Sequence, residues 1–410
     1  MTDTKKFKFH YGWVIAICCM LMMCSTALIS SGMSTNLNAM RQQLGFTNTQ
    51  TSLVLTIRSL SAFFAALLAN YYYKIGLKRG MVCAMVFGAL AFALFTLAGR
   101  NIVIIYIGAV MSGFCYSYGM MMPISMILKN WFNKSRGIAL AIASGGTGLM
   151  SVIFAPLVQS TVNNKGIKEA FLLQAAFMVF VGLLLAVFIV EKPEEKGMEP
   201  LGGKDFTPVK KGGNAAPREA TELSFFWILA IVAATASIGI GTSPASANFT
   251  NNLVTAGLDA MTVAKALSVY GFMLIGSKLL YGVCVDRLGT FKTTLIFGTV
   301  VSAGMFLLYI VNFFPGDLLM YIALIVVGFG TPVQTLGYPN WIVDLDSAHY
   351  NKSLVKCQTG YQLGAVVGSF LPGIIADRTG SYAGAFFMFF AVNAIGIIIV
   401  FFAYKSQKKR

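Results

Sequence analysis

The sequence predicts an all-α polytopic membrane protein whose twelve transmembrane helices form two pseudo-symmetric halves of six. Of the 410 residues, 57% are hydrophobic and only 11% are charged, whereas soluble domains carry about 25% charged residues. Twelve apolar runs have the roughly 20 residues that a membrane helix needs. Loop sequences at the ends of these runs also recur at a fixed offset between the two halves of the chain.

Six apolar runs of spanning length precede residue 191, and six follow residue 222. The first six are Tyr11 to Leu37, Thr51 to Tyr73, Gly80 to Ala98, Ile102 to Leu128, Gly137 to Val158 and Ala170 to Val190. The second six are Ser224 to Asn248, Thr262 to Val285, Thr293 to Asn312, Leu318 to Gly337, Leu354 to Ile375 and Tyr382 to Tyr404. We therefore predict an N-terminal half at 1–190, a cytoplasmic linker at 191–222 and a C-terminal half at 223–410. The linker is rich in Lys, Gly and Pro, which is typical of a mobile or partly helical segment.

The basic residues predict the orientation of the chain. If the N-terminus is cytoplasmic, 23 of the 31 Lys and Arg residues lie in the tails and inner loops, and only six lie in outer loops. Cytoplasmic loops are enriched in Lys and Arg, so we expect both termini in the cytoplasm and the protein in the inner (cytoplasmic) membrane. The formal net charge of +16 follows from this distribution and predicts contact with a lipid bilayer, not with nucleic acid.

Paired landmarks indicate an internal repeat. Gly76 follows the second span and Gly289 the eighth, an offset of 213 residues, while Gly166 and Gly380 precede the sixth and twelfth spans at an offset of 214. Repeated halves that rock about a site at the membrane midplane are the usual architecture of secondary transporters. The alternative is that similar loop glycines arose by chance.

Residues 282–289, GVCVDRLG, resemble the G-x-x-x-D-R-x-G loop signature of the major facilitator superfamily. The corresponding first-half segment is degenerate and lacks the acidic residue, with Tyr73 and Lys74 near its place. Asp286 and Arg287 are gating candidates, because charges at a helix end can pair across a loop and separate when the halves rock. Interfacial anchoring is the alternative role for each.

Three further segments resemble one branch of that superfamily. They are Tyr11-Gly12-Trp13, residues 130–137 (NWFNKSRG) and Phe225-Phe226-Trp227. Together with residues 282–289 they resemble the branch that holds the oxalate/formate antiporter family and the monocarboxylate transporters. This resemblance implies transport of a small organic anion, mostly a monocarboxylate or small dicarboxylate, by exchange or with a proton. Resemblance at the level of fold does not identify the substrate.

Two basic residues, Lys278 and Arg58, and no acidic residue lie in the predicted spans more than one helical turn from either end. A charged side chain in the membrane core is costly and is by default a functional candidate. Buried cations with no counter-charge favour an anionic substrate, whereas a cation site needs a carboxylate. Structural alternatives remain for both residues, since Lys278 can snorkel toward the cytoplasmic face and Arg58 can snorkel outward or bind backbone carbonyls.

The resemblance also identifies departures from the family pattern. Lys278 lies eight residues before Asp286, where the resembling family keeps a substrate-binding Arg, and lysine lacks the planar fork that reads carboxylate geometry. The antiporters carry a second basic residue in the eleventh span, where this chain has Tyr361 or Gln362. One cavity cation suggests a single carboxylate. Animal monocarboxylate transporters place an Asp where this chain has Leu274, so proton coupling would require Lys278 itself to titrate.

Polar and aromatic residues on the spans expected to line a cavity could complete a substrate site, because Tyr and Gln donate hydrogen bonds without adding charge. For each one taken singly, helix packing or a position at the membrane interface is the alternative. The candidates are Tyr118, Tyr270, Gln334, Tyr338, Tyr361 and Gln362.

The sequence therefore predicts a secondary transporter of a small organic anion, with a counter-anion or a proton as the possible second partner. A rival with the same fold is an exporter of lipophilic compounds, which the 21 Met residues would suit. A rival from another class is a transport-like ligand sensor that signals through the linker. The sequence has no phosphate loop, no hydrolase triad and no zinc or haem spacing, so we expect neither an enzyme nor a cofactor.

Overall fold

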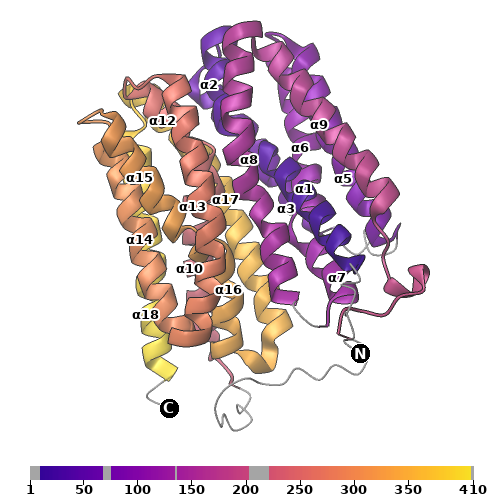
Figure 1. Ribbon diagram of the computed structural model, residues 1–410. Coiled ribbons are helices and arrows are strands. Elements are labelled where there is room, and N and C mark those ends of the chain that lie inside the picture. Colours follow the sequence, from indigo (N-terminus) through magenta and orange to yellow (C-terminus); the bar gives the residue numbers. More distant parts are fainter. Residues whose placement is uncertain (1–9, 68–74, 134–135, 203–220, 408–410) are drawn as a thin grey trace, which may run out of the picture.

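The computed structural model describes residues 10–67, 75–133, 136–202 and 221–407, which form a bundle of long helices (Figure 1). The described residues contain no β-strand and a single isolated bridge, between Phe132 and Leu201. The first helix begins and the last helix ends at the same end of the bundle. We call this the terminal end and the opposite one the distal end.

The N-terminal half contains eight of the described α-helices and is followed by a short 3-10 turn. These elements are α1 (Gly12–Ile29), α2 (Met33–Leu44), α3 (Asn48–Leu67), α5 (Leu77–Ala98), α6 (Ile102–Gly119), α7 (Met121–Trp131), α8 (Arg136–Lys165), α9 (Ile167–Phe188) and η1 (Pro193–Lys196). The C-terminal half contains α10 (Phe225–Gly241), α11 (Ser243–Ser246), α12 (Phe249–Thr255), α13 (Ala260–Leu288), α14 (Thr290–Ile310), α15 (Asp317–Gly330), α16 (Pro332–Leu345), η2 (Ser347–His349), α17 (Tyr350–Thr379) and α18 (Ala383–Gln407).

Eleven helical segments of the described chain are long and apolar enough to cross a membrane. They correspond to eleven of the twelve predicted spans. The predicted span Thr51 to Tyr73 corresponds to α3, and residues 68–73 at its end lie outside the described part. Polar residues in the first turns of α3 and the charge of Arg58 make this helix less apolar than the others.

Four spans that the sequence predicts as single helices are broken in the structure. The breaks separate α1 from α2, α6 from α7, α10 from α11 and α12, and α15 from α16. These are the first, fourth, seventh and tenth spans. Pro244 and Pro332 stand in the first turn of α11 and α16, where the missing N–H of proline costs no helical hydrogen bond. One break in every third span matches a build from three-helix repeats.

The paired loop glycines confirm the internal repeat. Gly76 (φ 98°) and Gly289 (φ 81°) immediately precede α5 and α14, and Gly166 (φ 98°) and Gly380 (φ 72°) immediately follow α8 and α17. All four adopt a positive φ that only glycine reaches at little cost. Equivalent loops of the two halves therefore make the same turn with the same residue type.

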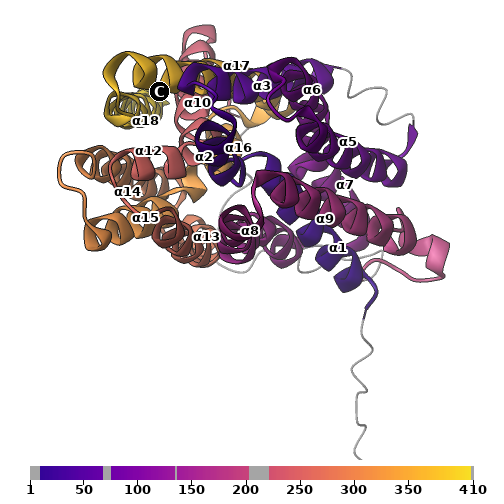
Figure 2. The same cartoon turned by 90° about the horizontal axis from the view of Figure 1, so that it is seen from above.

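The two halves meet along two seams. In one, α8 packs against α13, and in the other α3 packs against α17. Seen from above, the two seams lie on opposite sides of the bundle, with α2 and α16 between them (Figure 2). Each seam joins helices that are far apart in the sequence.

The described parts of the predicted linker are attached to different halves. Leu201 exchanges backbone hydrogen bonds with Trp131 and Asn133 in the N-terminal half. Thr221 binds Ser347 and the backbone of Asp344 in the C-terminal half. The turn η1 agrees with the expectation of a partly helical segment, and residues 203–220 lie outside the described part.

Candidate functional site

Arg58, on α3, is buried, with 2% of its surface exposed. Its Nη1 donates to the carbonyl of Ile29 at 2.9 Å, and its Nη2 donates to Ser243 Oγ at 3.1 Å and Ser59 Oγ at 3.4 Å. Its Nε has no hydrogen-bond partner among the described residues. The guanidinium is thus held by uncharged groups and keeps one donor unused.

The groups that hold Arg58 come from the breaks in the first and seventh spans. Ile29 is the last residue of α1, where the helix ends and its carbonyl is free to accept from outside. Ser243 is the first residue of α11, directly after the break at Thr242. Arg58 therefore lies where one broken helix from each half meets it, a position at which transporters place substrates near the membrane midplane.

Two tyrosines lie near this guanidinium, and a third lies beside one of them. The ring of Tyr116 lies 5.2 Å from the Arg58 Cζ atom, within cation–π range. The hydroxyl of Tyr361 interacts electrostatically with Arg58, Tyr116 and Tyr338, and the rings of Tyr338 and Tyr361 are 6.2 Å apart. Two of the predicted polar residues are thus brought together, and one of them, Tyr361, lies near Arg58.

Lys278 is buried in the α8–α13 seam, with 9% of its surface exposed. Its Nζ donates to the carbonyl of Ser144 at 2.9 Å and to Thr147 Oγ1 at 2.8 Å. Both acceptors belong to α8, in the other half. The ammonium therefore points into the seam and does not extend toward solvent at the terminal end of its helix.

The hydrogen-bond partners of Arg58 lie on α1, α3 and α11, whereas those of Lys278 lie on α8, so the two cations share none of them. No described carboxylate lies within ion-pair distance of either. Among the described residues, no group of three or more His, Cys, Asp or Glu is arranged to hold a metal ion. Each cation is instead held by neutral acceptors.

The other predicted residues lie elsewhere. Tyr118 packs beside Phe114 within the N-terminal half. Tyr270 is buried against Phe249 at 5.5 Å. Gln334 donates to the carbonyl of Gly241 at 3.2 Å and to Asn393 Oδ1 at 2.9 Å. Gln362 is half-buried on α17 next to Tyr361.

The gating candidates lie near the terminal end of α13. The side chain of Asp286 lies outside the described residues, and Arg287 is exposed. The gating role of both stays a prediction.

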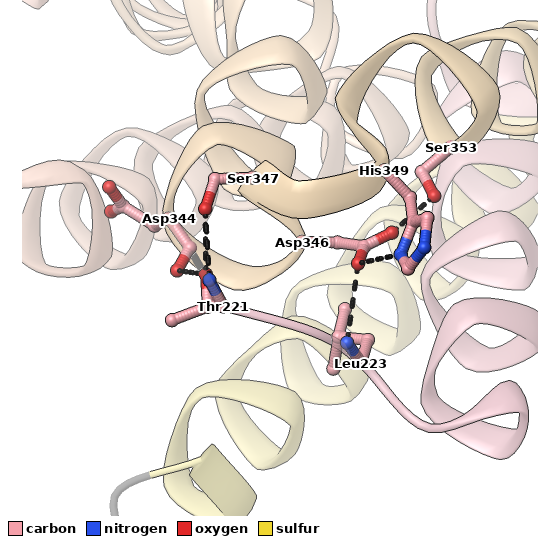
Figure 3. A network of polar contacts seen from close by, with 7 residues as sticks. All are labelled: Thr221, Leu223, Asp344, Asp346, Ser347, His349 and Ser353. Atoms are coloured by element: carbon pink, nitrogen blue, oxygen red, sulfur yellow. Dashed lines mark hydrogen bonds and ion pairs between the residues drawn. The ribbon is translucent and has the colours of Figure 1, made fainter. Parts of the chain in front are cut away.

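The terminal end holds a different, buried carboxylate. Asp346 is 1% exposed and accepts from Ser353 Oγ and from the backbone N–H of Leu223 at 3.3 Å, and its Oδ1 lies 3.4 Å from His349 Nδ1 (Figure 3). Leu223 directly precedes the turn into α10. This network therefore ties the end of the linker to the corner between α16 and α17.

Polar groups also join the halves at the distal end. Asp377, at the end of α17, accepts from the backbone N–H groups of Asn48 (3.0 Å) and Thr49 (2.7 Å) in the first turn of α3. Ser34 on α2 donates to Thr250 Oγ1 on α12 at 2.6 Å. The halves are thus closed against each other at this end.

Sequence reasoning missed Asp377 and Tyr116, and the sequence contains a signal for Asp377 alone. Asp377 belongs to residues 373–380, GIIADRTG, which repeat the G-x-x-x-D-R-x-G spacing of residues 282–289. Tyr116 lies one turn after Gly113, whose missing side chain lets α6 approach the backbone of Arg58. The two residues are three apart and therefore share a helix face, whereas Tyr118 points elsewhere.

The chain matches one family model and is similar to several known proteins. A family model described as Major Facilitator Superfamily matches residues 15–355 and 256–410. The oxalate:formate antiporter of Oxalobacter formigenes is 26% identical over 242 residues, which are 58% of this chain and 51% of that protein. The uncharacterized MFS-type transporter YhjX of Escherichia coli (strain K12) is 24% identical over 280 residues, 67% of this chain and 65% of that protein. The matches thus span about half and two thirds of these relatives.

Solved structures share the architecture at low sequence identity. The D-xylose-proton symporter superposes with a TM-score of 0.72 at 13% identity and covers 96% of both chains. The nucleoside transporter NupG superposes with a TM-score of 0.71 at 12% identity, over 96% of this chain and 100% of that one. At such identities the agreement concerns the fold alone. The relatives from Oxalobacter formigenes and Escherichia coli are named as an antiporter and a transporter, which agrees with the expectation that the chain is not an enzyme.

Proposed function

The chain belongs to the Major Facilitator Superfamily, and from this membership we propose that it is a secondary active transporter of a small organic anion. The substrate is a monocarboxylate, moved by alternating access of the two halves. Exchange with a second anion or symport with a proton drives the movement.

One observation carries the anion assignment. Arg58 and Lys278 are the buried basic side chains of the described chain, and no described carboxylate lies within ion-pair distance of either. A buried cation is costly when unpaired, and an anion that arrives with its own charge offsets that cost. The distant relative named an oxalate:formate antiporter supports the same substrate class.

The contacts of the two cations favour a single small carboxylate over a dianion. The two cations share no hydrogen-bond partner, which supports a substrate with one carboxylate over a dianion held by both. Beside Arg58, the unused Nε and the hydroxyls of Tyr116 and Tyr361 can donate to a carboxylate. Tyr338, Tyr118, Tyr270, Gln334 and Gln362 remain proposed secondary contributors to the cavity wall.

We also propose the placement of the protein in its membrane. The terminal end faces the cytoplasm and the distal end faces outward in the inner membrane. The chain divides at 1–190, 191–222 and 223–410. Asp286 and Arg287 at the terminal end contribute to the cytoplasmic gate.

The test is thermal stabilisation of the purified protein by lactate, pyruvate, formate, acetate, oxalate, aromatic acids and lipophilic cations. A ligand that binds only the folded state raises the apparent stability. We expect monocarboxylates to raise the melting temperature and Lys278→Gln to abolish that shift while the protein remains folded. Lys265→Gln is the matched control, because Lys265 lies on the same helix and is exposed.

Each rival gives a different result in this assay. A response to lipophilic cations alone would replace the anion assignment with the exporter. Stabilisation by a carboxylate without flux in reconstituted vesicles would support the ligand sensor. A carboxylate shift that survives in Lys278→Gln would remove Lys278 from the site.

A further inference from the structure

The carboxylate of Asp377 joins the halves at the distal end of the α3–α17 seam. It accepts from the backbone N–H groups of Asn48 and Thr49 and from Asn48 Nδ2 at 2.7 Å. The first N–H groups of a helix have no partner within that helix, and the helix dipole favours an anion there. A residue of the C-terminal half therefore caps a helix of the N-terminal half.

Arg41, at the end of α2, extends this contact. Its Nη1 donates to Asn48 Oδ1 at 2.6 Å and to the Tyr382 hydroxyl at 3.1 Å, and its Nη2 donates to Thr255 Oγ1 at 3.3 Å. The Tyr382 hydroxyl donates in turn to Asn48 Oδ1 at 3.0 Å. Asn48 thus links Asp377, Arg41 and Tyr382, and three of these four contacts cross between the halves.

The glycine that opens the G-x-x-x-D-R-x-G repeat makes this contact possible. A Cβ atom on Gly373 would lie 2.4 Å from the carbonyl oxygen of Asn48 and 2.4 Å from Ser52 Oγ. Only glycine therefore lets α17 come close enough for Asp377, one turn later, to reach the first turn of α3. The close approach of the two helices at Gly373 therefore accounts both for the glycine at the first position of the motif and for the hydrogen bonds of Asp377 to α3.

We propose that Asp377, Asn48, Arg41 and Tyr382 form a latch that holds the distal end closed. The latch must open before side chains buried between the two halves can be reached from that end. Asp377 itself is exposed to solvent, so water can replace its partners when the halves part. A latch built on charge-assisted hydrogen bonds to an exposed carboxylate is strong enough to favour one state and weak enough to break in each cycle. This role is independent of the substrate.

The experiment measures opening through the reactivity of a cysteine buried behind the latch. Ser34 is 1% exposed on α2, so in Ser34→Cys a membrane-impermeant maleimide added to intact cells reacts only while the distal end is open. Labelling at residue 34 is followed by peptide mass spectrometry, because the chain has seven native cysteines. No ligand is added, so failure of the latch and failure of the proposed anion transport are separate results.

Asp377→Asn removes the charge and is expected to raise the labelling rate about tenfold, the effect of about 1.4 kcal/mol on the opening equilibrium. Tyr382→Phe removes one hydroxyl and should raise the rate by a smaller factor. Asp259→Asn is the matched control, since Asp259 caps the first turn of α13 within its own half through Thr262. Its labelling rate should equal that of the parent.

Unchanged rates in both Asp377→Asn and Tyr382→Phe overturn the latch, as does an equal increase in Asp259→Asn. Labelling of the buried Cys115 reports unfolding, because this thiol has no exposed surface in the folded protein. If Cys115 also becomes reactive in Asp377→Asn or in Tyr382→Phe, that variant is unfolded to some extent. The other variant then tests the latch.

Discussion

At the scale of single residues, the environment of Arg58 explains how a guanidinium is tolerated inside the membrane. Two of its nitrogens bind a free helix-end carbonyl and a serine from the opposite half, and the Tyr116 ring lies within cation–π distance of it. Such contacts satisfy donors without neutralising the charge. The positive charge therefore remains available to an anion.

The same geometry distinguishes arginine from lysine at this position. We expect Arg58→Gln to weaken carboxylate binding about tenfold, because hydrogen bonds to a charged group contribute about 1.5–3 kcal/mol, and to impair uptake less than Lys278→Gln does. Arg58→Lys keeps the charge but cannot reach Ile29 and Ser243 together, so its affinity should lie between those of the parent and Arg58→Gln.

Arg100→Gln is the control, because Arg100 is exposed in a distal loop. Binding isotherms of the three variants measure the differences in affinity. Parent-like uptake by Arg58→Gln would assign this residue a purely structural role.

At the scale of helices, polar contacts fix the ends of the elements while apolar packing fixes their positions. Asp346 shows this at the terminal end, where one buried carboxylate holds the start of α10 against the corner of α16 and α17 (Figure 3). An unsatisfied buried group costs about 1–3 kcal/mol. The corner therefore depends on the charge of this side chain more than on its size.

Asp346→Asn should lower the melting temperature by several degrees, because the new amide group places a donor opposite the N–H of Leu223. Asp317→Asn is the comparison: Asp317 is exposed in the first turn of α15, where a charge contributes about 0.3–1 kcal/mol. Thermal unfolding in detergent measures both. Equal shifts in the two variants would contradict the importance of the buried network.

At the scale of the whole molecule, the two halves repeat the same turns and the same pattern of broken helices. The described hydrogen bonds between the halves include a cluster at the distal end. Two packed seams with a polar closure at one end suit rigid halves that rock, since packed interfaces switch between discrete states.

The orientation proposal predicts the side of the membrane on which inserted reporters lie. A fluorescent protein that folds only in the cytoplasm, fused after Arg410, should fluoresce, while alkaline phosphatase inserted at Gly257 in a distal loop should be active outside. The matched insertion at Gly197, beside η1 at the terminal end, should give inactive phosphatase. The reverse pattern would place both termini outside.

The sequence by itself determined the membrane class, the spans, the repeat and the two mid-membrane cations. These properties follow from local composition, because about 20 apolar residues predict a span and a charge within such a run is unusual wherever the run packs. Lys278 and Arg58 were identifiable for that reason alone.

The tertiary structure decided which residues meet. α6 is apolar on all sides, so its sequence does not indicate whether Tyr116 or Tyr118 faces Arg58, and the breaks in four spans occur inside continuous apolar runs. The contacts of Asp377 with α3 and of Lys278 with α8 join residues more than 100 positions apart. Contacts at such separations depend on how the two halves pack, which no local pattern of residues specifies.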